Sequence, residues 1–358
     1  MKHGHNIAFF ASSLVSAYWN GAATYYRGII KGLDDLGYSV TFYEPDAYDR
    51  QKHRDIADPS WARVHVYKAD ENGLGSALKS AKDADILIKA SGVGVFDERL
   101  EAAILDIKKN DAISIFWDVD APATLDRVKN NPDDAFAPLI PKYDLILTYG
   151  GGYPVIDAYK ELGAKDCVPI YNALDPATHF PVDEDSRYRC DLGFLGNRMP
   201  DREERIREFF FKAAKKMPEQ EFMLGGNGWD EPGIPNITYL GHVYTREHNS
   251  FNSSAKAVLN VNRESMARYG FSPPTRIFEA AGAGSCIITD SWKGIEMFLT
   301  PGEEVLVADS GDEVAELLGS LTPERAKEIG TAAYKRILAE HTYSHRARQL
   351  ESILRAIR

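Results

Sequence analysis

Short runs of apolar residues alternate with amphipathic segments along the chain, and the first half shows this pattern clearly. The segment 21–36 repeats apolar side chains at helical spacing, as at Ile29 and Leu33, and Gly37 closes it. The apolar runs on either side are typical of strands that are buried on both faces of a parallel sheet. Strand, helix and strand in succession predict βαβ units. Strands of the first half are expected at residues 6–11, 40–43, 86–90, 112–117, 143–148 and 167–171.

The same alternation starts again in the second half of the chain. Apolar runs recur there, and the segments between them have helical spacing, including a long one at 323–340. The sequence therefore predicts an α/β fold built of two Rossmann-like, doubly wound domains. Strands of the second half are expected at residues 191–195, 222–224, 237–240, 257–261, 285–289 and 305–307.

Composition limits the class of protein and its partners. The 358 residues are 44% hydrophobic and 27% charged, which is typical of a soluble globular protein. A net charge of −11 argues against general nucleic-acid binding but allows a local basic pocket. The chain shows no signal peptide and no apolar run of roughly 20 residues, so we expect a cytoplasmic protein without an integral membrane segment; peripheral membrane contact stays open. Cys167, Cys190 and Cys286 are expected as buried thiols, and no metal-ligand spacing is present.

The stretch from Arg263 to Asp290 contains the most informative chemistry. A helix is expected over 275–281, with Ser272 as its N-cap and two prolines before its first turn. The N-terminus of a helix attracts phosphate, and forked guanidinium groups suit a diphosphate. We therefore predict a phosphate site, with Glu279 one turn further on accepting hydrogen bonds from ribose hydroxyls. The predicted donor-side residues of this stretch are Arg263, Arg268, Ser272, Thr275, Arg276 and Glu279, and Arg198, after the first strand of the second half, is predicted to reach the diphosphate.

Two strand ends of the first half carry further candidates. Ser91 and Gly92 follow a predicted strand at the edge where open α/β sheets bind ligands. Asp118 and Asp120 follow the next one, and alternate residues of an extended segment point the same way. The two carboxylates could hold a divalent metal, or Asp120 could serve as general base for an acceptor hydroxyl, or Asp120 could simply cap the following helix.

The segment Pro273-Pro274-Thr275-Arg276-Ile277-Phe278-Glu279-Ala280 resembles the donor-nucleotide site of GT-B glycosyltransferases of the CgeB-like (spore-maturation-protein-like, group 1) type. The segment 172–181 resembles the linker of such enzymes, and Trp117, Asp120 and Pro122 match their Trp-x-x-Asp-x-Pro segment. In the wider retaining group, two glutamates lie eight positions apart. Glu279 matches the second, but Phe271 stands at the first.

This resemblance implies two domains that face a central cleft: an acceptor-side domain over 1–172 and a nucleotide-sugar domain over 173–340. It also implies that the last helix, in 341–358, packs back on the first domain. Asn20 and Gly21 would line the cleft with Ser91, Gly92 and Asp118, and Gly241 and His242 would lie near the nucleotide base.

The activity implied is transfer of a sugar, of the hexosyltransferase type, from a nucleotide diphosphate sugar to a hydroxyl of a glycan, lipid-linked or small-molecule acceptor. No metal or other cofactor is expected, because arginines supply the positive charge. Two alternatives stay open: a sugar-nucleotide epimerase of the same fold, and a nucleotide-sugar-binding protein without catalysis. A dehydrogenase is disfavoured, since no Gly-x-Gly-x-x-Gly follows the first strand.

Overall fold

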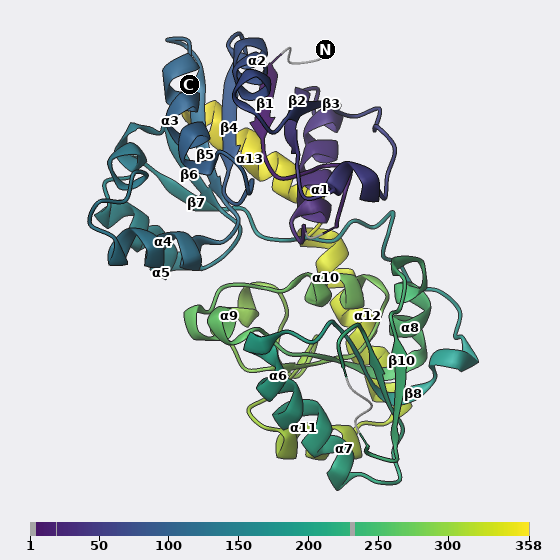
Figure 1. Ribbon diagram of the computed structural model, residues 1–358. Helices are drawn as coiled ribbons and strands as arrows, with labels where there is room; N and C mark the ends of the chain where they lie inside the picture. The colour runs from purple at the N-terminus through teal and green to yellow at the C-terminus, as the bar shows by residue number, and fades with distance from the viewer. Residues whose placement is uncertain (1–4, 19, 230–232, 358) are drawn as a thin grey trace. The chain divides into compact units, whose positions relative to one another are not determined.

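A computed structural model describes residues 5–18, 20–229 and 233–357 (Figure 1). The chain divides into two compact units, which we call unit 1 (Met1–Tyr171 with Tyr343–Arg358) and unit 2 (Asn172–Thr342). These bounds lie within two residues of those expected from the sequence. In the described part of the chain, no helix combines the length and the apolar character that crossing a membrane requires.

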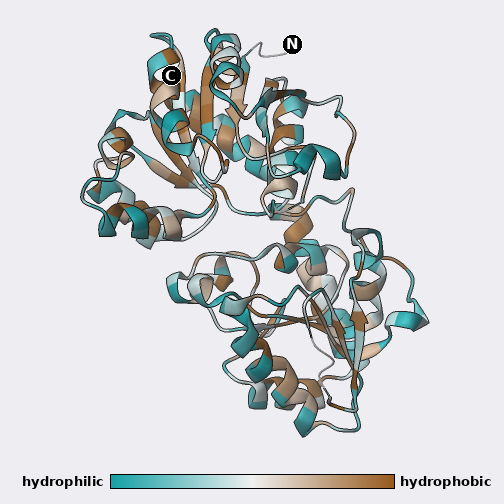
Figure 2. Cartoon of the chain, viewed as in Figure 1, coloured by the Kyte–Doolittle hydropathy of each residue, from teal (hydrophilic) through white to brown (hydrophobic). Residues whose placement is uncertain are grey.

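Unit 1 is built around a parallel sheet in the order β3-β2-β1-β4-β5-β6-β7. The central strands are the apolar runs of the sequence, and their side chains are almost completely buried, as at Phe9, Ile88 and Phe116. Figure 2 shows these strands in brown and much of the surrounding helical surface in teal. The elements are β1 (Asn6–Phe10), α1 (Ala23–Asp35), β2 (Ser39–Asp46), β3 (Arg63–Lys68), α2 (Glu71–Ala81), β4 (Ile86–Ala90), α3 (Asp97–Ile107), β5 (Ile113–Asp118), α4 (Ala121–Asn130), β6 (Leu145–Thr148), α5 (Gly152–Glu161), β7 (Cys167–Pro169) and α13 (Tyr343–Ile357), with short helices at Arg50–His53 and Ala137–Lys142.

The last helix of the chain, α13, packs against α1 in unit 1 (Figure 1, yellow against purple). Close approach is possible because α1 has glycine at the contact: a Cβ added to Gly28 would lie 2.2 Å from the ring of Tyr343. Arg346 donates from Nε to the Tyr171 carbonyl oxygen at 3.2 Å. The Tyr25 hydroxyl donates to the Ile170 carbonyl oxygen at 2.5 Å. The end of the chain is thus an integral layer of unit 1.

Unit 2 has its own parallel sheet, in the order β10-β9-β8-β11-β12-β13. Each unit therefore has the doubly wound, Rossmann-like organisation predicted from the sequence, and that prediction is confirmed. The elements are β8 (Cys190–Leu195), α6 (Pro200–Ile206), a π-helical turn (Arg207–Phe211), α7 (Lys212–Lys216), β9 (Phe222–Gly225), β10 (Ile237–Gly241), α8 (His248–Ser254), β11 (Ala255–Asn260), α9 (Glu264–Tyr269), α10 (Thr275–Gly282), β12 (Ile287–Asp290), β13 (Leu306–Ala308), α11 (Gly311–Ser320) and α12 (Pro323–Glu340), with short helices at Ser186–Tyr188, Thr245–Glu247 and Ile295–Met297.

The start of α10 differs from the sequence prediction. Pro274 is the N-cap residue, and the Ser272 hydroxyl donates instead to the Gly270 carbonyl oxygen at 3.0 Å. Ser272 is therefore not the N-cap of this helix. The reason is the pair of prolines, which keeps the chain extended up to Pro274 and places Ser272 too early to reach the first free N–H groups.

Candidate functional site

A pocket of about 230 Å³ opens among the carboxyl ends of the unit 2 strands, where doubly wound sheets bind their ligands. The ends of β8 and β9 form its floor, and the segment after β10 together with α8 and α10 forms its walls. Arg276 and Glu279, one turn apart on α10, both line it. The complete lining is Leu195, Gly196, Asn197, Gly225, Gly226, His242, Val243, Thr245, His248, Asn252, Arg276 and Glu279.

Arg276 carries the positive charge of this pocket. Its guanidinium group donates to the Leu195 carbonyl oxygen and to Asn260 Oδ1, the latter at 3.3 Å, and lies 4.9 Å from the ring centre of Phe194. Burial lowers the pKa of Arg276 to about 9, and the neighbouring Arg202 contributes in the same direction. The fold thus holds a cation here at an electrostatic cost, which an anionic ligand would relieve.

Arg202, on α6, was not singled out from the sequence. Its Nη2 atom donates to the Asn197 carbonyl oxygen at 2.5 Å, and its guanidinium lies 5.6 Å from the ring centre of Phe194. Arg202 and Arg276 meet at Gly196, because a Cβ added there would lie 2.9 Å from the Nη2 atoms of both. Two partly buried guanidinium groups side by side are suited to a ligand with more than one negative charge, such as a diphosphate.

Carboxylates hold the arginines behind the pocket. Arg205 donates to Asp290 Oδ2 at 2.6 Å and to the Asn262 carbonyl oxygen at 3.1 Å. Asp290 is completely buried at the end of β12, and burial raises its pKa. Arg263 makes an ion pair of 2.6 Å with Asp201. These pairs fix the loops at the ends of β11 and β12 and leave Arg276 as the arginine that faces the pocket.

The remaining donor-side predictions divide into two groups. Glu279, Arg276 and His242 line the pocket, and Thr275 is the half-buried first residue of α10. The residues outside the lining are Arg198, Gly241, Arg263, Arg268 and Ser272. Arg198 is paired with Glu203 at 2.6 Å, and Arg263 with Asp201 as described above. The Gly241 carbonyl oxygen accepts from Gly226 N, and Arg268 is exposed on α9 with its guanidinium 5.5 Å from the ring centre of Tyr269.

The loop before α10 has a buried aromatic ring where the resemblance expects a carboxylate. Phe271 has a φ of 48°, is 8% exposed, and donates its N–H to the Lys293 carbonyl oxygen at 2.6 Å. Gly294 permits this contact, since a Cβ there would lie 2.4 Å from the Phe271 ring. The ring is therefore fixed between two loops and holds the backbone just before α10.

Glu279 also belongs to a compact polar group. The side-chain ligand atoms of Glu279, His179 and His248 all lie within 4.8 Å of one another. His179 follows the segment that enters unit 2, and His248 is the first residue of α8. Within the described part of the chain, His179, His248 and Glu279 are close enough together to bind one metal ion.

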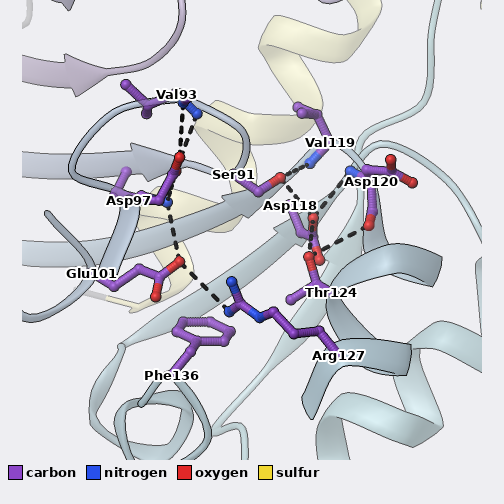
Figure 3. Close-up of polar contacts among 12 residues, drawn as sticks. Ser91, Val93, Asp97, Glu101, Asp118, Val119, Asp120, Thr124, Arg127 and Phe136 are labelled. Carbon is purple, nitrogen blue, oxygen red and sulfur yellow. Dashed lines mark hydrogen bonds and ion pairs between the residues drawn. The ribbon is translucent and has the colours of Figure 1, made fainter. Parts of the chain in front are cut away.

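In unit 1, Asp118 is a structural residue. It is completely buried at the end of β5 (Figure 3). It accepts hydrogen bonds from Ser91 Oγ at 2.7 Å, Thr124 Oγ1 at 3.1 Å, Asp120 N at 3.0 Å and the Tyr159 hydroxyl at 2.5 Å. The sequence hypothesis that Asp118 and Asp120 face one ligand is therefore wrong. The strand ends at Asp118, so the alternation of side chains does not continue to Asp120.

The other unit 1 candidates also separate into structural and exposed residues. Asn20 is buried, and its side chain binds within its own loop, to Ser12 Oγ at 2.8 Å and to two carbonyl oxygens. Ser91 is buried against Asp118. Asp120 is exposed at the start of α4, Gly21 is exposed just before α1, and Gly92 is exposed after β4.

A buried ion network supports the loop after β4. Lys89 is completely buried, and its Nζ lies 2.7 Å from Asp97 and 3.2 Å from Glu101. Asp97 in turn accepts from the backbone N–H groups of Val93 and Gly94 at 3.1 and 2.8 Å (Figure 3 shows Asp97 beneath Val93). The network fixes the shape of residues 91–94 at the edge of the sheet.

Comparison with known proteins gives one family match, and it covers part of the chain. A family model described as "Glycosyl transferase-like" matches residues 202–352, which include α10 and most of the pocket. No curated protein sequence matches the chain significantly.

Solved structures share the fold over the whole chain. Sucrose-phosphate synthase from Thermosynechococcus elongatus has a TM-score of 0.67 at 13% identity, with 99% of each chain covered. Anabaena HepE in complex with UDP and glucose has a TM-score of 0.68 at 14% identity, covering 98% of this chain and 100% of that one. T4 phage BGT in complex with UDP-glucose has a TM-score of 0.61 at 13% identity, covering 98% and 99%. At these identities the likeness shows the fold, which is that of GT-B glycosyltransferases.

Proposed function

We propose that this protein is a glycosyltransferase that moves a sugar, of the hexosyl type, from a nucleotide diphosphate sugar to an acceptor hydroxyl. The observation that carries the proposal is the pair of guanidinium groups of Arg202 and Arg276 beside a pocket that Glu279 also lines. The partial family match over residues 202–352 supports it. UDP is the nucleotide proposed, because solved structures with this fold were determined with UDP or UDP-glucose.

The proposed donor complex uses each part of the pocket. The diphosphate lies against Arg276, with Arg202 behind it, and the ribose hydroxyls donate to Glu279. The base lies along the segment after β10, where His242 and Val243 line the wall. As the bond from the sugar to the diphosphate breaks, negative charge gathers on the leaving group, and the preorganised guanidinium groups stabilise it without reorganising. In this proposal the transfer itself requires no metal.

Asp120 is proposed to accept or orient the proton of the acceptor hydroxyl. Its exposure at the start of α4, at the carboxyl edge of the unit 1 sheet, supports this role, whereas Asp118 is fully engaged. The segment 273–280 and the match at Trp117, Asp120 and Pro122 support a CgeB-like enzyme whose acceptor is a glycan, a lipid-linked hydroxyl or a small molecule.

The first experiment compares UDP, GDP, dTDP, ADP and CDP by thermal shift. A ligand that binds only the folded state increases the free energy of unfolding, by about 2.7 kcal/mol at a concentration of a hundred times its Kd. This stabilisation raises the melting temperature. We expect UDP to stabilise the wild type and to lose this effect in Glu279→Ala. Glu316→Ala, an exposed glutamate on α11, is the matched control and should behave like the wild type. No shift with any nucleotide would refute the donor site.

Catalysis is then tested by following UDP release from UDP-glucose in the presence and absence of sugar acceptors. Asp120→Asn should bind UDP as the wild type does but transfer at least about 100-fold more slowly, the lower range of general-base effects. EDTA should leave the wild-type rate undiminished. An Asp120→Asn variant with the full rate would remove the proposed base.

A further inference from the structure

The group formed by His179, His248 and Glu279 has features that binding of a nucleotide does not require. The three residues come from separate segments of unit 2, and their ligand atoms lie within 4.8 Å of one another. His179 is 9% exposed, and its Nε2 atom is buried with no hydrogen-bond partner in the described part of the chain. An unpaired buried ring nitrogen is costly, so its presence on a histidine of this group calls for a functional explanation.

The hydrogen bonds of the two imidazole rings leave one nitrogen of each ring with a lone pair for a metal ion. The Thr178 hydroxyl donates to the Asp175 carbonyl oxygen at 3.0 Å, so it accepts from His179 Nδ1, 2.9 Å away. His179 Nε2 therefore carries a lone pair. His248 Nε2 lies 3.2 Å from the Val243 carbonyl oxygen and must donate to it, which leaves the lone pair on Nδ1 of that ring. Histidines that bind metals are oriented in this way, by a hydrogen bond from the nitrogen that does not touch the ion.

We propose that His179 Nε2, His248 Nδ1 and the Glu279 carboxylate form a zinc site with a fourth position open to water. Two imidazoles and one carboxylate are a common zinc ligand set, whereas magnesium and calcium prefer oxygen ligands. Ligand bonds of about 2.0–2.2 Å put tetrahedral ligand atoms roughly 3.4 Å apart. The ligand atoms are now up to 4.8 Å apart, so side-chain rotations that shorten these separations by up to about 1.4 Å bring the three groups to that spacing.

Zinc and nucleotide exclude one another at this site. Glu279 and His248 both line the pocket, and a carboxylate bound to zinc cannot also accept from ribose hydroxyls. Zinc would hold residues 175–179 against α8 and α10 in a form that does not bind the donor. This consequence rests on the proposed function; zinc binding itself does not.

The test is a titration with Co²⁺, whose visible absorption reports tetrahedral binding, followed by displacement with Zn²⁺. His3 and His5 near the N-terminus could bind metal by chance, so both are replaced by alanine in every protein compared. His179→Asn keeps a donor toward Thr178, and His248→Gln keeps a donor toward Val243, while each removes the ligand atom. His242→Ala removes a histidine of the same pocket outside the group and is the matched control. Melting temperatures without metal establish that each variant is folded.

We expect one Co²⁺ per chain, displaced by Zn²⁺. The affinity for Co²⁺ should fall at least about 100-fold in His179→Asn and in His248→Gln, because loss of an outer-shell partner alone can cost that much. It should be unchanged in His242→Ala. Absence of binding, or equal binding in the ligand variants, would overturn the site. Saturating UDP should weaken Co²⁺ binding at least about tenfold. Simultaneous binding of both would overturn the exclusion, whereas failure of UDP to bind the metal-free protein would count against the proposed function alone.

Discussion

Replacing Arg276 by glutamine separates the cost of its charge in the free protein from the benefit of that charge in the nucleotide complex. In the free protein the guanidinium is partly buried beside Arg202, and the resulting fall in its pKa to about 9 shows that the fold disfavours the charge. Glutamine removes the charge and retains a donor for the Leu195 carbonyl oxygen. The variant should therefore fold about as stably as the wild type but bind UDP poorly.

The expected magnitudes follow from the contacts. Loss of hydrogen bonds and of the ring contact with Phe194 destabilises the variant, and relief of the repulsion from Arg202 stabilises it, so the free energy of unfolding should change by less than about 1 kcal/mol. In the complex, a hydrogen bond to a charged group contributes about 1.5–3 kcal/mol. UDP affinity should fall by roughly 10- to 150-fold. Arg276→Lys keeps the charge without the forked donors and should lie between the two.

Calorimetric titration with UDP, beside urea unfolding of the same samples, measures both quantities. Arg268→Gln is the control, because this arginine is exposed on α9 and outside the pocket lining, and it should change the affinity less than about twofold. Wild-type affinity in Arg276→Gln would refute the placement of the diphosphate. A large loss in Arg268→Gln would show that α9 contributes to the site.

Three further substitutions test other parts of the structure. Gly28→Ala places a methyl group against the Tyr343 ring and should lower the free energy of unfolding by about 1–3 kcal/mol in urea, unless α13 is not docked there. Gly196→Ala should weaken UDP binding in calorimetry, since its Cβ would displace the two guanidinium groups; unchanged binding would contradict this. Burial raises the pKa of Asp144, but hydrogen bonds from Lys108, Lys165 and Ser114 lower it by a larger amount. The pKa in the folded protein is therefore below that of an aspartate in the unfolded chain. Its contribution to stability is therefore present above about pH 4 and is lost on acidification. Because the carboxyl of the unfolded chain titrates near pH 4, only about 1 kcal/mol of this contribution is lost between pH 7 and pH 3. Asp144→Asn should reduce the stability difference between these two pH values by about that amount, which unfolding curves at both pH values measure.

The apolar runs of the sequence were sufficient to predict most of the sheet strands, because strands covered on both faces must be apolar throughout. β3 was missed for the converse reason. It lies at the edge of its sheet, pairs only with β2 among the described strands, and mixes Arg63, His65 and Lys68 with apolar residues instead of forming a continuous apolar run. An edge strand needs fewer apolar side chains, and its signal in the sequence is correspondingly weak.

The lining of the candidate pocket includes some of the residues singled out from the sequence. Arg276 and Glu279 lie one turn apart on a single helix, so sequence spacing was enough to place them together. Arg202 is brought to Arg276 only by the packing of α6 and α10 around the end of β8, a relation that no local pattern contains. Asp118 and Asp120 were wrongly paired because the end of a strand, and with it the end of the alternation, cannot be fixed to the residue from sequence.

The course of the chain has a consequence for biosynthesis. Unit 2 is inserted within unit 1, and its two ends are tied together where Leu174 N donates to the His341 carbonyl oxygen at 2.8 Å. A ribosome therefore synthesises all of unit 2 before it makes α13, the helix that packs against α1. Unit 1 is therefore started first and completed last, and the face of α1 that α13 covers stays exposed until α13 has been synthesised.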